Sequence, residues 1–245
     1  MNLEGFLFKT HKAIIRGYAR TLLNFDLLME EALPPGPKIL AANHPTTTDP
    51  FLLPLLVDEP IYIFVTGMAF ETPLFGKILK RAGHIRVDKS LGNKINTVHQ
   101  AVKRLAQGGN IGIFPEGSLS PVPGKFCPAR TGAARLAVSS GAPVIPVGIH
   151  HSPNACFYKK IRTTNYEQTA RWVVRGEYYL TVGKAMYFSG DIEDHKEIRC
   201  ISCQIMDAII QQSISSQKRM ATPQIKWQPL IPHLLRGESL LTSKS

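Results

Sequence analysis

Short apolar runs alternate with longer amphipathic segments over most of the chain, and this alternation predicts the secondary structure. The apolar runs typical of strands are residues 38–42, 61–65, 84–87, 110–114 and 144–149. The segments with helical periodicity are residues 50–57, 68–81, 94–107 and 129–139. Glycines such as Gly83 and Gly141 follow the helical segments, as expected at helix C-caps. Strands and helices in this alternation predict an α/β fold with a mostly parallel central sheet flanked by helices.

The pattern is less regular toward the C-terminal end. Residues 173–182, which are interrupted by Arg175-Gly176-Glu177, predict further strand material, and residues 192–214 predict a closing helix. The segment from Pro223 onward has no regular periodicity. We therefore expect three parts: an N-terminal amphipathic helical segment over residues 1–33, an α/β domain over residues 38–217, and a C-terminal tail over residues 218–245.

The first segment, residues 5–28, predicts a helix with two different faces. At 100° per residue, five apolar or aromatic side chains fall on one side, and four cations cluster within roughly 80° on the other. The first set is Leu7, Ile14, Tyr18, Leu22 and Phe25, and the second is Lys9, Lys12, Arg16 and Arg20. A basic face opposite an apolar face is typical of a helix that lies in a membrane interface. A packing helix with a solvated basic side is the alternative interpretation.

Composition narrows the class of partner. The chain has 245 residues, enough for one sizeable core, and a formal net charge of +11. A surplus this large indicates an anionic partner: nucleic acid, a phospholipid surface or a phosphorylated ligand. The sequence contains no zinc-finger spacing, RNP-like motif or clear helix-turn-helix, so we expect no nucleic acid partner.

The same composition bears on the compartment. No stretch reaches the roughly 18 apolar residues of a spanning helix. Four scattered cysteines give no disulfide framework, and Cys200-x-x-Cys203 has no second pair with which to bind a metal. We therefore expect a peripheral membrane protein on the cytoplasmic side, facing anionic lipid, with no metal site.

The block Asn43-His44-Pro45-Thr46-Thr47-Thr48-Asp49 holds the first candidate for chemistry. His44 follows a predicted strand, and ligands bind at the carboxyl ends of strands in open α/β sheets. Asp49 precedes a proline, which predicts a helix N-cap. One carboxylate oxygen can cap the helix while the other accepts a hydrogen bond from the imidazole, leaving the second ring nitrogen free to take a proton. A capping aspartate beside a turn histidine is the structural alternative.

Three further blocks follow predicted strands or contain one. They are Gly83-His84-Ile85-Arg86-Val87-Asp88-Lys89, Phe114-Pro115-Glu116-Gly117-Ser118 and Pro143-Val144-Ile145-Pro146-Val147. The chain lacks the Gly-x-Ser-x-Gly motif of a nucleophile elbow. A histidine paired with a carboxylate but with no assigned nucleophile suits a general base that acts on a substrate hydroxyl.

The four blocks, in this order, resemble those of the PlsC-like glycerolipid acyltransferases, the family of lysophosphatidic acid acyltransferases. That family has an Asn-His-x-x-x-x-Asp block, a Gly-x-Ile-x-x-Asp-Arg block, a Phe-Pro-Glu-Gly-Thr-Arg-Ser block and a Pro-Val-Ile-Pro-Val block. The resemblance spans about residues 38–217. It implies a glycerol-3-phosphate acyltransferase-like fold for this acyltransferase domain, and acyl transfer from acyl-CoA or acyl-carrier protein to the hydroxyl of a lysolipid. 1-Acylglycerol-3-phosphate is the favoured acceptor, phosphatidic acid the product, and no cofactor is implied.

By the same resemblance, His44 is the general base, Asp49 orients it, and the acceptor oxygen attacks the thioester without an acyl-enzyme. The residues implied to bind the acceptor are Arg86, Lys89, Glu116, Gly117 and Ser118.

Two positions depart from the family's pattern. Leu119 stands where the third block has arginine, and Lys89 stands where the second block has arginine. Leucine cannot bind phosphate, and lysine offers a point charge in place of a planar fork. Lys125 and Arg130 are candidates for compensating phosphate contacts. The alternatives are an acceptor without a phosphomonoester, such as another lysophospholipid or an amino-acid lipid, and a non-catalytic basic lipid-binding protein.

Overall fold

A seven-stranded sheet organises the computed structural model, which describes residues 3–87, 93–122, 124–163 and 166–222. Its strands are β1 (Leu23–Met29), β2 (Ile39–Ala42), β3 (Ile61–Thr66), β4 (Ile85–Val87), β5 (Asn110–Ile113), β6 (Val144–His151) and β9 (Gly176–Val182). They lie in the order β1-β9-β6-β2-β5-β3-β4. Every neighbouring pair is parallel except β6 and β9. The predicted α/β fold with a mostly parallel sheet is confirmed.

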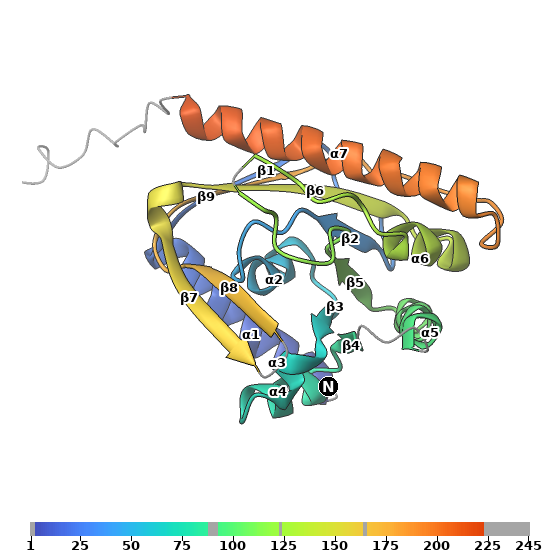
Figure 1. Cartoon of the computed structure of the whole chain (residues 1–245), viewed down its shortest axis with the longest axis horizontal. Coiled ribbons are helices and arrows are strands. Elements are labelled where there is room, and N and C mark those ends of the chain that lie inside the picture. Colours follow the sequence, from blue (N-terminus) through green and yellow to red (C-terminus); the bar gives the residue numbers. More distant parts are fainter. Residues whose placement is uncertain (1–2, 88–92, 123, 164–165, 223–245) are drawn as a thin grey trace, which may run out of the picture.

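Helices cover both faces of this sheet. They are α1 (Leu3–Thr21), α2 (Asp49–Leu52), the 3-10 helix η1 (Leu53–Leu56), α3 (Gly67–Glu71), α4 (Phe75–Arg81), α5 (Asn93–Ala106), α6 (Gly132–Ser140), the 3-10 helix η2 (Pro153–Ala155) and α7 (His195–Ala221). Figure 1 shows α7 above the sheet and α1 and α2 beneath it. The two core layers follow the alternation of β2: Ile39 and Ala41 pack toward α5, α6 and α7, and Leu40 and Ala42 pack toward α1, α2 and η1. A strand buried on both faces explains the uninterrupted apolar run.

The prediction of one helix over residues 5–28 is wrong in its second part. Helix α1 ends at Thr21, and the next residues form β1, which pairs in parallel with β9. Phe25 therefore lies on a strand, with its ring stacked 6.5 Å from that of Tyr178. Pairing at the sheet edge overrode the helical periodicity of these residues, as tertiary context can. The N-terminal segment thus supplies a strand of the main sheet.

The faces of α1 also differ from the prediction. Tyr18 packs toward the core and donates its hydroxyl to the Val173 carbonyl. Lys12 is turned toward the protein, where its ammonium lies 2.7 Å from an Asp58 carboxylate oxygen. Ile14, by contrast, is 66% exposed. The exposed side of α1 combines apolar and basic side chains, namely Phe6, Lys9, Ile14, Arg16 and Arg20. None of the described helices is long and apolar enough to cross a bilayer.

The predicted helix over residues 68–81 is two helices, α3 and α4. Pro73 separates them because proline cannot continue a helix, and Leu74 follows with a positive φ of 63°. The strand material over residues 173–182 is interrupted close to the predicted Arg175-Gly176-Glu177: Val173 ends one strand, and β9 starts at Gly176.

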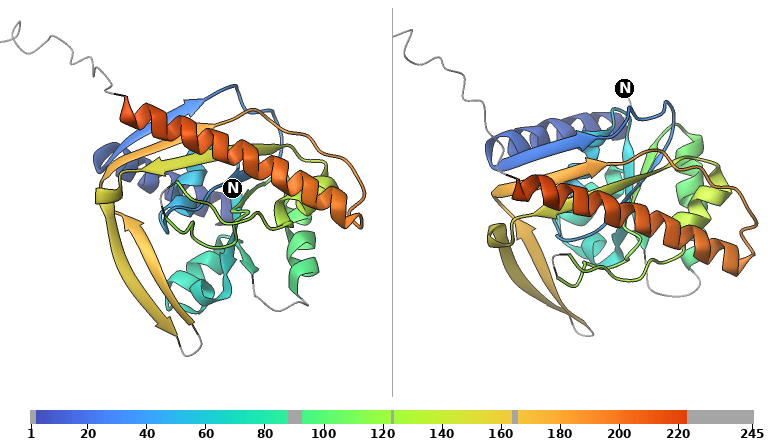
Figure 2. Two further views of the ribbon diagram at one scale, coloured as in Figure 1. Left: turned by 45° about the horizontal axis from the view of Figure 1, so that its top comes forward. Right: turned by 90° about the horizontal axis from the view of Figure 1, so that it is seen from above.

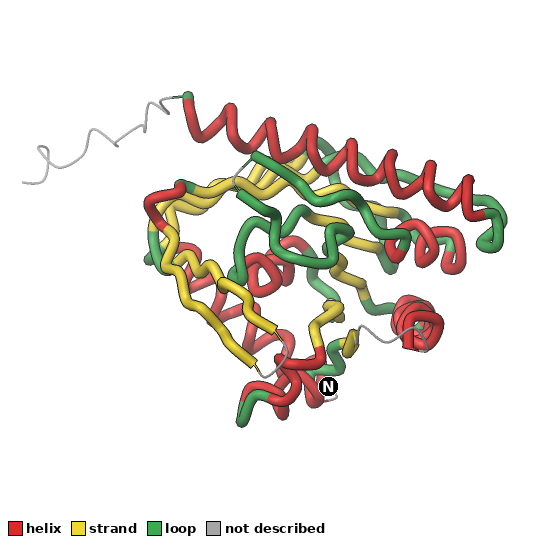
Figure 3. The backbone as a smooth tube through the Cα atoms, viewed as in Figure 1, coloured by secondary structure: helices red, strands yellow, loops and turns green. Residues whose placement is uncertain are grey.

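That strand belongs to a hairpin that the apolar pattern did not predict. It consists of β7 (Cys156–Thr163) and β8 (Tyr166–Val173), paired antiparallel. Figure 2 shows the hairpin standing away from the main sheet, and the tube in Figure 3 shows the same separation. Strand β8 runs beside the loop after β2: Thr47 N donates to Arg171 O at 2.7 Å, and Val173 N donates to Thr48 Oγ1 at 3.0 Å. The hairpin therefore covers the loop that carries His44.

The predicted closing helix over residues 192–214 starts later and runs further, as α7. Asp194 caps it, accepting from Lys196 N at 2.8 Å and from Glu197 N at 3.1 Å. Residues 218–221 of the predicted tail belong to this helix, and residues 223–245 lie outside the described part of the chain.

Helix α7 approaches β6 so closely that one position requires glycine. A Cβ atom added at Gly148 would lie 2.0 Å from backbone atoms of Gln212 and Ser213. Ser216 Oγ donates to the Gly148 carbonyl at 2.9 Å across the same contact.

Gly148→Ala is therefore expected to lower the free energy of unfolding by about 3 kcal/mol, the upper end of the usual cost of overpacking a core. Gly17→Ala is the matched control, because a Cβ at Gly17 meets nothing within 4 Å and the exposed helical site should gain roughly 0.5–1 kcal/mol. Urea denaturation measures both. Equal midpoints for the two variants would contradict the close packing of α7 on β6.

Candidate active site

The loop after β2 holds His44 at the carboxyl ends of the central strands. The Asn43 side chain donates to Ile149 O at 2.9 Å and accepts from Ile149 N at 2.7 Å, which fastens the loop to β6. His44 N donates to Glu116 Oε1 at 2.9 Å, which fastens it to the segment after β5. These hydrogen bonds fix the loop at Asn43 and at the backbone of His44, independently of the contacts that the imidazole ring makes.

The imidazole of His44 is paired with Asp49, as predicted. Nδ1 lies 2.9 Å from Asp49 Oδ2, and the ring stacks on Phe114 with centroids 4.1 Å apart. The Asp49 side chain is fully buried, and that of His44 is 18% exposed. Within the described part of the chain, Nε2 has no hydrogen-bond partner. A proton on Nδ1 directed at the carboxylate leaves Nε2 as the nitrogen that can accept one.

The predicted capping role of Asp49 is wrong. Helix α2 begins at Asp49 itself, and no side-chain hydrogen bond caps it. Instead, Oδ2 also accepts from Thr46 N at 2.8 Å, and Oδ1 accepts from the hydroxyls of Thr46 and Tyr178. Because the side chain is fully buried, both oxygens are satisfied by donors from the core and neither turns to the helix end.

Glu116 of the third block lies beneath the loop. It is 1% exposed, and Oε1 accepts from His44 N at 2.9 Å and from Ser120 Oγ at 2.6 Å. Oε2 accepts from Cys127 N at 2.8 Å. The structure therefore brings this predicted acceptor-binding residue to the site as a brace that joins three segments, with its carboxylate directed at protein donors.

Gly117 and Ser118, the other two acceptor candidates of this block, are exposed. Gly117 has a φ of +65°, and a Cβ there would lie 2.5 Å from Arg130 Nε, so glycine lets the Arg130 side chain lie against the turn. Ser118 Oγ is 3.7 Å from Cys127 Sγ. Arg130, one of the two compensating candidates, is thus brought to the third block.

The second block contributes less charge than its sequence indicates. His84 is half-buried, and its Nδ1 accepts from Ile63 N at 3.1 Å. Burial, with a smaller effect of His11, lowers the pKa of His84 to about 4, so the ring is neutral near pH 7. Arg86 lies on β4 with its guanidinium 2.9 Å from Glu71 on the surface. Lys89 lies outside the described residues.

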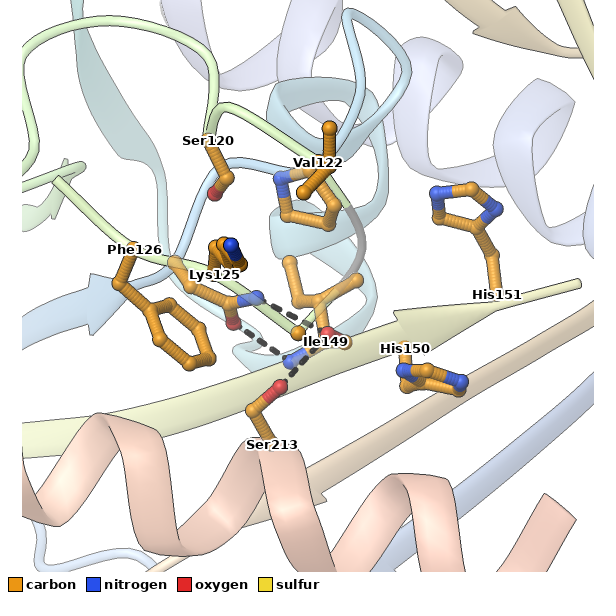
Figure 4. A pocket seen from close by; sticks show the side chains of 11 residues that line it. Ser120, Val122, Lys125, Phe126, Ile149, His150, His151 and Ser213 are labelled. Atoms are coloured by element: carbon orange, nitrogen blue, oxygen red, sulfur yellow. Dashed lines mark hydrogen bonds between the residues drawn. The ribbon is translucent and has the colours of Figure 1, made fainter. Parts of the chain in front are cut away.

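Lys125, the other compensating candidate, lines a pocket beside the loop (Figure 4). The pocket is small, with a cavity volume of about 10 Å³. Phe126, His150 and Ser213 are among its other walls, and His44 is absent from its lining. Burial, with a smaller effect of His151, lowers the pKa of His150 to about 4, so Lys125 is the cation here. Asn43 and Pro45, the neighbours of His44, also line this pocket, so Lys125 lies beside the loop.

Three contributors to the site were not predicted. Thr46 lies inside the first block, three residues before Asp49, and its hydroxyl was the available signal. Arg171 on β8 donates to the carbonyls of Ser120 and Pro121, so the hairpin also holds the third-block loop. Tyr178 on β9 is 129 residues from the aspartate that it contacts, and no local pattern points to that contact.

These features define the class of site. An open α/β sheet presents a histidine oriented by a buried carboxylate at the carboxyl ends of its strands, where ligands bind. Among the described residues, no serine or cysteine lies within hydrogen-bond distance of His44 Nε2. The arrangement can take a proton from a bound hydroxyl and return it to a leaving group.

Comparison with known proteins gives the family. The family model described as Acyltransferase matches residues 25–150, a range that contains the His44–Asp49 pair and Glu116. The chain belongs to the acyltransferase family. The resemblance seen in the four sequence blocks is confirmed.

Individual relatives agree with this assignment. The chain is 28% identical over 141 residues to a 1-acyl-sn-glycerol-3-phosphate acyltransferase of Haemophilus influenzae, covering 55% of this chain and 58% of that protein. It is 29% identical over 121 residues to the protein of the same name from Salmonella typhimurium, covering 49% of each. The chain thus matches about half the length of these curated relatives.

A solved structure shares the fold. The crystal structure of the 1-acyl-sn-glycerophosphate acyltransferase PlsC from Thermotoga maritima matches with a TM-score of 0.62 at 17% identity. The match covers 89% of this chain and 82% of the other, so the likeness extends beyond the segment that the family model covers.

The bracing role of Glu116 is testable through stability. Glu116→Gln replaces one acceptor oxygen by an amide NH₂, which would face either Cys127 N–H or the donors of His44 and Ser120. At least one donor then loses its partner, at an expected cost of about 1.5–3 kcal/mol of unfolding free energy.

Glu71→Gln is the control, because Glu71 makes an exposed ion pair with Arg86 that should contribute less than about 1 kcal/mol. Chemical denaturation of the two variants gives the comparison. A Glu116→Gln protein as stable as Glu71→Gln would show that the carboxylate does not brace the loop.

Proposed function

We propose that this protein transfers a fatty acyl group from acyl-CoA or acyl-carrier protein to the free hydroxyl of 1-acylglycerol-3-phosphate, giving phosphatidic acid. The observation that carries the proposal is the His44–Asp49 pair, with Nδ1 directed at the carboxylate and Nε2 available to a substrate. The names of the relatives support the choice of acceptor. The family's third block, with Glu116 and Gly117 in place, supports a catalytic protein over a lipid-binding one.

The chemistry follows from the geometry of the pair. His44 Nε2 takes the proton of the acceptor hydroxyl while the hydroxyl oxygen bonds to the thioester carbonyl carbon. The carbon–sulfur bond then breaks, and the departing thiolate takes the proton back from His44. Asp49 stabilises the imidazolium that exists between the two proton transfers. It also keeps the neutral ring in the tautomer that these two steps require. The acyl group passes directly from sulfur to oxygen, so no acyl-enzyme forms.

A phosphate-bearing acceptor needs cations near the third block, where Leu119 replaces the family's arginine. Arg130 supports this acceptor, because its side chain lies against Gly117, two residues from Leu119. A guanidinium at this point can form the charge-assisted, bidentate contacts that phosphate favours. We assign Arg130 as the principal compensating phosphate contact, with Lys89 as a second cation.

Leu119 itself favours a second candidate. An apolar side chain at the position of a phosphate ligand fits an acceptor without a phosphomonoester, such as another lysophospholipid or an amino-acid lipid. In that case Leu119 lines an apolar wall, and Arg130 serves the packing of the turn.

We also propose that the exposed side of α1 rests on an anionic membrane surface on the cytoplasmic side, as part of a peripheral membrane protein. Phe6 and Ile14 are 52% and 66% exposed, and Lys9, Arg16 and Arg20 lie exposed on the same helix. Among the described residues none of these three cations has an ion-pair partner. Exposed apolar side chains beside unpaired cations suit the boundary between headgroups and acyl chains.

His44→Ala is expected to reduce acyl transfer to lysophosphatidic acid by about 10²–10⁴-fold, the usual cost of losing a general base. The loss should fall on kcat, and the thermal transition should persist. His99→Ala, on the exposed side of α5, is the matched control and should retain wild-type turnover. Assays with labelled acyl-CoA measure both. Turnover within a few-fold of wild type in a folded His44→Ala protein would disprove the mechanism.

Arg130→Gln is expected to raise the KM for lysophosphatidic acid about tenfold and to leave that for the acyl donor unchanged. The reason is the loss of a charge-assisted contact of about 1.5–3 kcal/mol. Leu119→Arg should lower the KM for the same acceptor, and Lys196→Gln, remote from the site, should change neither value. An unchanged acceptor KM in Arg130→Gln, with reduced activity in Leu119→Arg, would favour the acceptor that lacks a phosphomonoester.

Replacing Lys9, Arg16 and Arg20 together by glutamine is expected to move the protein from the pellet to the supernatant when it is sedimented with anionic vesicles. Each cation near an anionic surface contributes about 1 kcal/mol, and salt should weaken the wild-type binding because it screens the attraction. The control removes the same charge elsewhere, at exposed Lys103, Lys184 and Lys196. Equal loss of binding in the two triple variants would assign the attraction to net charge alone.

A further inference from the structure

We propose that Tyr178 is a positioning residue that locks the Asp49 carboxylate, and through it His44, in the arrangement that a general base requires. The inference rests on the proposed function and extends it to a residue outside the four sequence blocks. Tyr178 is fully buried on β9, so its side chain acts through Asp49 and does not touch the acceptor or the donor.

The contacts of Asp49 show what the tyrosine adds. Oδ1 accepts from two hydroxyls, those of Tyr178 and Thr46. Oδ2 accepts from Thr46 N at 2.8 Å and faces His44 Nδ1 at 2.9 Å. With donors on both oxygens, the carboxylate cannot turn about its Cβ–Cγ bond without breaking hydrogen bonds, so Oδ2 remains directed at the imidazole.

The strands fix the tyrosine ring from both sides. In the sheet, Phe25 of β1 and His151 of β6 are the residues directly opposite Tyr178. The Phe25 ring lies 6.5 Å from the tyrosine ring at an interplanar angle of 21°, and the His151 ring lies 6.3 Å away at 24°. Cross-strand aromatic neighbours of this kind restrict ring motion. The hydroxyl is therefore held at one point, beside Oδ1.

The hydroxyl also keeps its proton. Burial, and after it the negative charge of Asp49, raises the pKa of Tyr178 well above its usual value of 10.0. A tyrosine that does not ionise over the working range of an enzyme is a constant donor, and its partner is a constant acceptor. A constant donor suits this position, because the hydrogen bond from Tyr178 to Oδ1 leaves Oδ2 as the oxygen that faces His44.

The consequence is a specific tautomer of His44. Oδ2 held toward the ring favours the proton on Nδ1, which leaves Nε2 unprotonated and able to act as base. Without the tyrosine hydroxyl, one donor on Oδ1 remains, and the carboxylate gains freedom to turn away. Fewer molecules then hold the reactive tautomer, while the binding of both substrates is unaffected.

Kinetics of Tyr178→Phe test the proposal, because phenylalanine keeps the ring between its neighbours and removes the hydroxyl alone. We expect kcat to fall by about 10–100-fold, by analogy with the loss of a hydrogen-bond partner that orients a metal ligand, with unchanged KM for donor and acceptor. Tyr62→Phe is the matched control. Its hydroxyl donates to Glu4 Oε2 at 2.8 Å, remote from His44, and its removal should leave kcat at the wild-type value.

A spectroscopic readout separates positioning from general damage. In protein labelled with ¹⁵N-histidine, two-bond proton–nitrogen correlations report the tautomer of each ring, and the His44 signals are assigned by their loss in His44→Gln. We expect the Nδ1–H form in the wild type and in Tyr62→Phe, and a measurable share of the Nε2–H form in Tyr178→Phe. Should Tyr178→Phe not fold, Phe25→Leu loosens the ring with its hydroxyl intact and is expected to lower kcat in the same direction.

Wild-type kcat and an unchanged His44 tautomer in Tyr178→Phe would overturn the inference and leave the proposed function intact. If the wild-type protein transfers no acyl group to any lysolipid, the proposed function fails instead. The tautomer comparison then still decides whether Tyr178 positions His44. A fall in kcat of equal size in Tyr62→Phe would assign the effect to stability and also overturn the inference.

Discussion

The hydrogen bond between His44 Nδ1 and Asp49 Oδ2 is the interaction on which the site depends. Asp49 has no exposure to water, and burying a carboxylate is costly unless hydrogen-bond donors of the protein replace its hydration. Thr46 and Tyr178 supply those donors, and their number explains why the aspartate can stay buried at the start of α2. The cost of burial is thus offset by contacts that also orient the histidine.

The surrounding fold serves mainly to hold this pair still. Asn43 fastens the loop to β6, and Glu116 fastens it to the segment after β5. Arg171 ties the hairpin to the third-block loop, while the backbone of β8 pairs with Thr47. The third block therefore contributes to the site in two ways, with Glu116 beneath the histidine and Gly117 on the surface beside Arg130.

The sequence predicted those strands and site residues that depend on contacts between residues close together in the chain. The runs that became β2, β5 and β6 are mostly apolar because these strands are buried on both faces, and His44 and Asp49 lie five residues apart in the sequence. The helix predicted through Phe25 was wrong because pairing of β1 with β9 is a long-range interaction that side-chain periodicity does not report. The β7–β8 hairpin was not predicted, because the consecutive residues Lys159 and Lys160 interrupt the alternation of apolar and polar residues that indicates a strand. Tyr178 could not be predicted, since its role exists only once β9 lies beside β6.

In the proposed mechanism acyl transfer is direct, with His44 as base and no covalent intermediate on the protein. Intact-protein mass spectrometry on samples quenched in acid within milliseconds of mixing with excess acyl-CoA tests it most directly. With acceptor absent, we predict a protein of unchanged mass. With lysophosphatidic acid present, we predict the appearance of phosphatidic acid while the protein mass still does not change. A species heavier by one acyl group that forms without acceptor, and disappears at the rate of product formation when acceptor is added, would contradict the account.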